Sequence, residues 1–158
     1  MTTTEILQIE FDEIKKDLIS KHNQLKMKAS GNWQESLVVD VRNKSESIVI
    51  ARVYGEHYTE QLVNGRKPGK FPPIEAIKKW VIEKGIAGIM EKAKVSSIAF
   101  LIARKIAKEG TKYYRDSGTD LVSSVYTPER IQSIIDKVSE INITFITNGL
   151  VQQLKEVA

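Results

Sequence analysis

Three of the chain's four prolines lie within eight residues, in the run Arg66-Lys67-Pro68-Gly69-Lys70-Phe71-Pro72-Pro73. Proline has no backbone N–H and fixes its own φ angle, so this run excludes both a continuous helix and a central strand. We therefore predict a loop of fixed shape at residues 66–73. Because proline is favoured at the first position of a helix, Pro73 also predicts where the next helix begins.

Two helices are predicted after this loop from the spacing of apolar residues. The first covers 73–84 and ends at Gly85. The second covers about 95–109 and ends at Gly110. Ser96 or Ser97 is the residue expected to begin it. The first helix carries a stripe of apolar residues. The second helix is expected to bury its own apolar stripe and to leave Arg104 and Lys108 exposed to solvent. The stripe residues are Ile74, Ile77, Trp80 and Val81, then Ile98, Ala99, Leu101, Ile102 and Ile106.

The rest of the chain predicts a mixed architecture. Alternating and β-branched residues indicate an antiparallel hairpin. The predicted elements are an N-terminal helix at 4–29, a hairpin at 36–54 turning at Lys44-Ser45-Glu46, a short helix at 56–63, a long loop or irregular strand pair at 111–127, and a C-terminal helix from about 128. We predict an α+β fold, with a small antiparallel sheet packed with four to five helices in a single domain.

Composition excludes several kinds of site. The chain has 158 residues, of which 41% are hydrophobic, and no cysteine. A disulfide scaffold, a thiolate zinc site, an iron–sulfur cluster and a cysteine nucleophile are therefore all excluded. The chain starts with acidic residues where a secretory signal would be basic and then apolar, and no run approaches the ~18 apolar residues of a membrane span. We expect a soluble protein made in a reducing compartment.

Charge is distributed unevenly along the chain. Residues 66–115 contain thirteen Lys or Arg and four acids, a local charge of +9, whereas the whole chain carries +4. The remaining residues therefore carry −5. This split predicts a polarised surface that meets nucleic acid, an acidic protein or another copy of the chain. The alternative is a solvated lysine-rich face.

Candidate catalytic and metal-binding groups are few. Glu56, His57 and Glu60 place two carboxylates and an imidazole close together, which favours a metal-dependent hydrolase only weakly because such sites usually need three or four ligands. The run Asp116-Ser117-Gly118-Thr119-Asp120 lacks the spacing of a calcium loop and indicates a turn. No phosphate-binding glycine loop or Gly-x-Ser-x-Gly motif occurs. We predict no metal, no cofactor and no enzymatic activity.

The middle of the chain combines several motifs in a fixed order. They are Tyr54-Gly55, Tyr58, Leu62, Asn64-Gly65-Arg66, Pro68-Gly69, Pro72-Pro73, Ile77, Trp80-Val81, Lys84-Gly85-Ile86, Ala99-Phe100, Ile102-Ala103-Arg104, Ile106 and Gly110-Thr111. Together they resemble the HK97-type minor tail, tail-completion or neck proteins of tailed bacteriophages. The resemblance covers residues 54–111. It ends at Lys112-Tyr113-Tyr114, where members of that family often continue with a Pro-Phe step.

The resemblance implies an α+β virion protein without catalytic activity. Such a protein would form a homo-oligomeric ring at the neck or the top of the tail, and would complete the tail or join it to the head. Implied partners are other copies and neighbouring neck, portal-adaptor, tail-tube or terminator proteins, with incidental contact to DNA in the channel and none to membranes. The implied location is the virion neck or tail, after synthesis in the bacterial host cytoplasm.

From these motifs we predict an interface on the proline loop and on the basic face of the helix at 95–109. Packing of Trp80 and Phe71 is expected to hold the loop, so that its cations project toward an acidic neighbour. The predicted interface residues are Arg66, Lys67, Lys70, Phe71, Arg104 and Lys108, and the predicted structural anchors are Tyr58, Gly65, Pro72, Pro73, Trp80 and Gly110. The alternative function is a DNA-binding accessory protein that uses the basic 66–115 segment.

Overall fold

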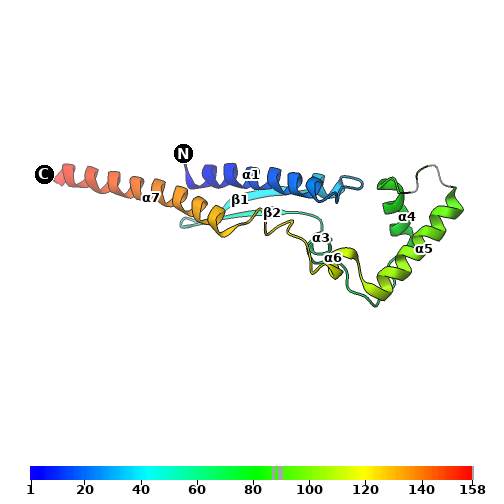
Figure 1. The fold of residues 1–158 in the computed structure, drawn as a ribbon. Helices are drawn as coiled ribbons and strands as arrows, with labels where there is room; N and C mark the ends of the chain where they lie inside the picture. The colour runs from blue at the N-terminus through cyan, green and yellow to red at the C-terminus, as the bar shows by residue number, and fades with distance from the viewer. Residues whose placement is uncertain (87, 89–90, 158) are drawn as a thin grey trace. The chain divides into compact units, whose positions relative to one another are not determined.

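The structure, a computed structural model, describes residues 1–86, 88 and 91–157. Its described part has the predicted α+β fold, a two-stranded antiparallel sheet packed with helices in a single domain (Figure 1). The elements in chain order are α1 (Thr3–Gln24), α2 (Asn32–Ser36), β1 (Val38–Ser45), β2 (Ile48–Tyr54), α3 (Thr59–Asn64), α4 (Ile74–Glu83), α5 (Lys92–Glu109), α6 (Lys112–Arg115) and α7 (Pro128–Val157).

The domain divides into two compact units. The first consists of Met1–Leu18, Val38–Tyr54 and Ser123–Ala158, and the second of Ile19–Leu37 and Gly55–Val122. The predicted interface residues all belong to the second unit. The hairpin and α7 belong to the first.

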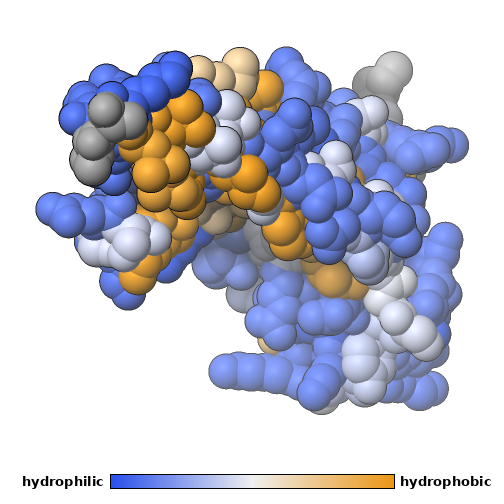
Figure 2. Space-filling model, turned by 90° about the vertical axis from the view of Figure 1, so that its left-hand side faces the viewer, coloured by the Kyte–Doolittle hydropathy of each residue, from blue (hydrophilic) through white to orange (hydrophobic). Residues whose placement is uncertain are grey.

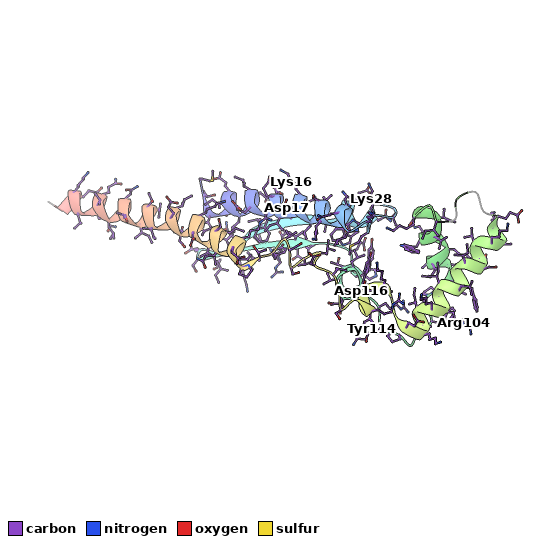
Figure 3. The ribbon with its side chains drawn as sticks, in the orientation of Figure 1. Lys16, Asp17, Lys28, Arg104, Tyr114 and Asp116 are labelled. Carbon is purple, nitrogen blue, oxygen red and sulfur yellow. The ribbon has the colours of Figure 1, made fainter. Side chains whose placement is uncertain are left out.

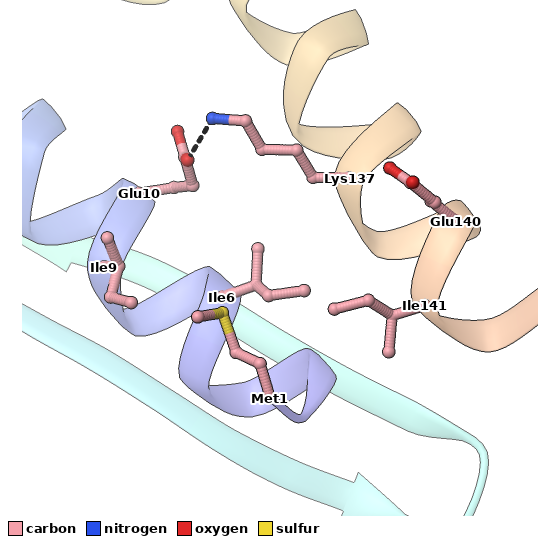
Figure 4. A pocket seen from close by; sticks show the side chains of 7 residues that line it. All are labelled: Met1, Ile6, Ile9, Glu10, Lys137, Glu140 and Ile141. Carbon is pink, nitrogen blue, oxygen red and sulfur yellow. Dashed lines mark hydrogen bonds and ion pairs between the residues drawn. The ribbon is translucent and has the colours of Figure 1, made fainter. Parts of the chain in front are cut away.

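The first unit joins the start of α1 to the hairpin and to α7. β1 and β2 pair antiparallel with Val41 opposite Ala51, and the register shifts between Asn43 and Ser45. Arg130 of α7 donates to Asp17 of α1 at 2.6 Å. The side chains buried here are Ile6, Ile14, Leu18, Val125 and Ile134. A pocket of about 300 Å³ between α1 and α7 is lined by Met1, Ile6, Ile9, Glu10, Lys137, Glu140 and Ile141 (Figure 4).

The second unit is built around the pair of helices α4 and α5, which lie side by side (Figure 1). Their shared core is Val81 and Val95, with Ile77, Ile98 and Ile102 packed against it. Ala99 and Ala103 of α5 are also fully buried, and their small side chains let neighbouring elements approach closely. The helix α3 contacts α6.

Several predicted boundaries were wrong at the start of the chain. The N-terminal helix was predicted to reach residue 29 but ends at Gln24, because Lys26 takes a left-handed φ of 56° and the Met27 N–H bonds back to the His22 carbonyl at 3.1 Å. The first strand begins at Val38, not at residue 36, because residues up to Ser36 form α2. The hairpin turns at Glu46 and Ser47, one residue later than predicted.

The later elements agree more closely with prediction. α3 begins at Thr59 and not at residue 56, and α5 begins at Lys92 with Glu91 as its N-cap, ahead of the predicted serines. α4 begins directly after Pro73. The segment 111–127 contains the short helix α6 and no strand among these residues, all of which are described. α7 begins at Pro128, as predicted.

Two predicted core residues lie at the surface. Leu101 was expected to be buried in the second helix but is 61% exposed. Trp80 is 39% exposed. Leu101 is exposed because α5 packs through the side that carries Ala99 and Ala103, and Leu101 lies on the opposite side of that helix.

Candidate functional site

The proline loop is fastened to the end of α5 by backbone hydrogen bonds. The Gly69 N–H donates to the Ala107 carbonyl at 2.7 Å. The Arg66 N–H donates to the Thr111 hydroxyl at 2.8 Å, and the Thr111 N–H donates to the Arg66 carbonyl at 2.9 Å. The segment 66–73 contains no helix or strand, as predicted. We call this set of contacts, made by Arg66, Gly69, Ala107 and Thr111, the loop clasp.

Two glycines make the loop clasp possible. Gly110 has a φ of 79°, and a Cβ added there would lie 2.7 Å from the Arg66 carbonyl oxygen. Gly65 has a φ of 75°, and its added Cβ would lie 2.1 Å from the Tyr114 nitrogen. Real Cβ atoms do not approach other atoms so closely, and left-handed φ values favour glycine. Both glycines were predicted as anchors, and the structure brings them to the same place.

A second segment holds the chain just before the loop. The Thr119 N–H donates to the Val63 carbonyl at 2.7 Å, and the Thr119 hydroxyl donates to the Leu62 carbonyl at 2.8 Å. Gly118 passes close to the same carbonyl of Val63. Residues 62–69 are therefore held by the end of α5 and by the segment after it, which was predicted as a long loop or irregular strand pair.

Around the loop clasp lies a surface that combines cations with aromatic rings. Phe71 is 41% exposed and its ring centroid lies 5.8 Å from that of Phe100 on α5. On α5, Arg104 lies one helical turn after Phe100, and Lys108 lies two turns after it. Figure 3 shows Arg104 on this helix. We call this the basic–aromatic surface; its exposed members are Lys67, Lys70, Phe71, Phe100, Arg104 and Lys108.

The cations of this surface carry uncompensated charge. In the part of the chain that the structure describes, Lys67, Lys70, Arg104 and Lys108 form no ion pair. The neighbouring acid Glu109 is already paired with Arg115 at 2.9 Å. An acidic partner could therefore bind here without breaking an internal ion pair.

Some of the predicted site residues have a different structural role from the one expected. Arg66 is half-buried, and its guanidinium donates to the Lys70 carbonyl at 3.3 Å, so it braces the loop instead of projecting from it. Phe71, which was expected to hold the loop together with Trp80, packs its ring beside that of Phe100 on α5. Phe100 is one of the motif residues, but the sequence analysis assigned it no role. Its position one helical turn before Arg104 is the signal that could have identified it as a member of this surface.

Three further predicted anchors, Tyr58, Pro72 and Pro73, lie at or just before helix starts. Pro72 is buried, and Pro73 is the N-cap of α4. Tyr58 is the N-cap of α3, where burial raises the pKa of its phenol. These residues set where helices begin.

The suggested metal-binding cluster does not assemble in the described residues. The His57 ring nitrogen Nδ1 lies 3.5 Å from the Glu56 carboxylate, on a largely exposed side chain. In the described ranges no group of three or more His, Asp or Glu side chains could hold a metal ion. In the run 116–120, Ser117 and Gly118 form a turn with positive φ values, and Asp120 is paired with Lys21 at 2.7 Å. That contact lowers the pKa of the Asp120 carboxyl.

A buried histidine is the most perturbed titratable group. His22 is 3% exposed and stacks on Trp33 with 4.5 Å between ring centroids. Its Nδ1 lies 3.0 Å from the Gln34 amide nitrogen. Burial, assisted by the charges of Lys84 and Lys28, lowers the pKa of His22 to about 4. The histidine is therefore neutral at pH 7 and serves the packing of the second unit.

Comparisons of the chain with protein-family models, curated proteins and solved structures found no match. None of the helices in the described residues is long and apolar enough to cross a membrane.

Proposed function

We propose that the protein is a structural component of a tailed-phage or prophage virion. It forms a ring at the neck or the top of the tail, and either completes the tail or joins it to the head. The observation that carries this proposal is the basic–aromatic surface, held on a loop that the loop clasp fixes in one shape. The motif order that resembles phage neck and tail-completion proteins supports it.

A fixed loop suits a docking role. The proline-rich sequence and the hydrogen bonds to α5 mean that little conformational entropy is lost when the loop binds a partner. The exposed Phe71 and Phe100 rings offer apolar contact at the centre, and the cations around them select an acidic partner. Outside residues 66–115 the chain carries −5, so another copy can supply that acidic face. Contacts between two different faces of identical copies generate rings.

The direct test reverses one charge on the surface. Arg104→Glu should leave the fold intact, because the side chain is exposed, and should give filled heads with separate tails in electron micrographs of lysates. The matched control is Lys94→Glu, an exposed lysine on the same helix, which should give normal particles. An undiminished yield of infectious particles from Arg104→Glu would refute the docking role.

A DNA-binding accessory function is the second candidate. It is favoured by the two exposed phenylalanine rings beside unpaired cations, since aromatic rings can stack on bases while cations bind phosphates. Binding of the purified protein to single- and double-stranded DNA at several salt concentrations separates the two candidates. Tight binding at physiological salt, lost in Arg104→Glu, would favour DNA; loss of binding at that salt would leave the virion proposal in place.

A further inference from the structure

The C-terminal half of α7 is a helix without cover. Every residue from Asn142 to Glu156 is exposed, and we call residues 142–156 the α7 tail. The tail includes large apolar side chains: Ile143 is 63% and Leu154 is 70% exposed. No charged residue occurs from 141 to 154. In Figure 2, which views the C-terminal end of α7 in the foreground, apolar residues gather in a nearly continuous band.

The apolar side of α7 changes along its length. In the first half, Ile134 is buried and Ile141 is half-buried on the side that faces α1. Ile143 follows Ile134 by nine residues, and Leu150 follows Ile141 by the same number, which is two and a half helical turns. The tail's stripe of Ile143, Ile146, Leu150 and Leu154 therefore points away from the side that α1 covers. Its burial must come from another surface.

The tail is also a poor helix by itself. Residues 142–156 are rich in β-branched residues and asparagine, and they include Gly149, all of which disfavour helix. In proteins most helical stability comes from packing of an apolar face and not from intrinsic propensity. A fifteen-residue tail of this composition, helical throughout, indicates a partner that covers its stripe.

We propose that the partner is the α7 tail of a second copy, packed antiparallel. The stripe spacing of three, four and four residues is that of a helix–helix seam. An antiparallel arrangement with its two-fold axis between residues 148 and 149 places Ile143 against the partner's Leu154 and Ile146 beside the partner's Leu150. The same patch then meets itself, as a two-fold interface requires.

Charge selects the antiparallel direction. Glu140 and Lys155 are exposed, and neither forms an ion pair in the described residues. They are fifteen residues apart, so they lie within about 60° of each other around the helix axis and on the same side of the stripe. Antiparallel packing brings Lys155 beside the partner's Glu140. Parallel, in-register packing would instead leave Lys155 about 22 Å along the axis from the partner's Glu140.

The first test measures self-association by analytical ultracentrifugation. The natural protein should sediment as a dimer or a multiple of it. Leu150→Asp places a charge in the stripe and should raise the dissociation constant at least ~100-fold, with loss of helical circular dichroism as the uncovered tail melts. The matched control is Gln152→Asp, which adds the same charge nine residues after Ile143, on the opposite side of the tail, and should change neither quantity.

The second test fixes the direction, and it uses the absence of natural cysteine. A mixture of Ile143→Cys and Leu154→Cys proteins should form a disulfide-linked heterodimer on oxidation, whereas either protein alone should not crosslink. A monomeric natural protein, or equal behaviour of the two aspartate variants, would overturn the proposal. Crosslinking of Ile143→Cys to itself would overturn the antiparallel register.

This inference stands apart from the proposed virion function. Arg104 lies in the second compact unit and the α7 tail in the first. Arg104→Glu should therefore keep the tail contact while it abolishes joining, and Leu150→Asp should lose the tail contact whatever the function of the basic–aromatic surface.

Discussion

At the scale of single residues, Gly110 decides whether the loop clasp can close. Gly110→Ala combines a left-handed φ with a Cβ 2.7 Å from the Arg66 carbonyl, so we expect the free energy of unfolding to fall by roughly 2–3 kcal/mol. Gly85→Ala is the control, because Gly85 has a φ of 71° but nothing within 4 Å, and should cost about 1–2 kcal/mol. Urea unfolding measures both, and equal costs would contradict a close contact at Gly110.

The buried His22 makes stability depend on pH. Its pKa is about 4 in the folded protein against 6.5 ordinarily, so the unfolded chain takes up a proton first as the pH falls. The contribution of neutral His22 to the free energy of unfolding is fully present above pH 6.5. As the pH falls through 4 this contribution is lost, and the free energy of unfolding falls by about 3 kcal/mol. His22→Phe keeps an aromatic ring against Trp33 without a titrating group. The stability difference between the two proteins should change by that amount between pH 7.5 and 4; parallel pH profiles would disprove this role for His22.

At the scale of elements, Thr111 joins the loop to α5. Thr111→Val preserves shape but removes the hydroxyl that accepts the Arg66 N–H, which should cost about 1–2 kcal/mol and speed amide hydrogen exchange at Arg66 and Gly69. The control is Ser97→Ala, which removes a hydroxyl that donates to the Ala93 carbonyl within α5. Unchanged exchange in the loop would show that the remaining clasp hydrogen bonds suffice.

The elements that the sequence predicted well are those with local signals. Prolines at 68–73 predicted the loop, Gly85 and Gly110 predicted two helix ends, and apolar spacing predicted α7 from Pro128. The end of α1 was missed because a lysine takes the left-handed position there, where glycine is the usual signal.

Long-range packing explains what the sequence could not provide at the candidate site. The cations and Phe71 were predicted from the sequence, but Phe100 became their neighbour only through the packing of α5 against the loop. The exposure of Leu101 likewise depends on which side of α5 is covered, and apolar spacing alone does not distinguish that side.

At the scale of the whole molecule, the two proposed surfaces imply different kinds of assembly. The α7 tail is self-complementary, so its contact is satisfied when two copies meet. The basic–aromatic surface needs a different, acidic face on its neighbour, so its contact repeats from copy to copy and can close a ring. Because they belong to different compact units, each can be removed by substitution without touching the other.

The loop clasp also determines when during folding the basic–aromatic surface comes into existence. Its hydrogen bonds join Arg66 to Thr111, forty-five residues later, across the intervening helices α4 and α5. Contacts of such sequence separation form late, after the segments between them are ordered. A nascent or partly folded chain therefore does not display the finished surface. Under the docking role proposed above, only subunits that have completed folding would be competent to join, which would protect a growing assembly from incorporating defective copies.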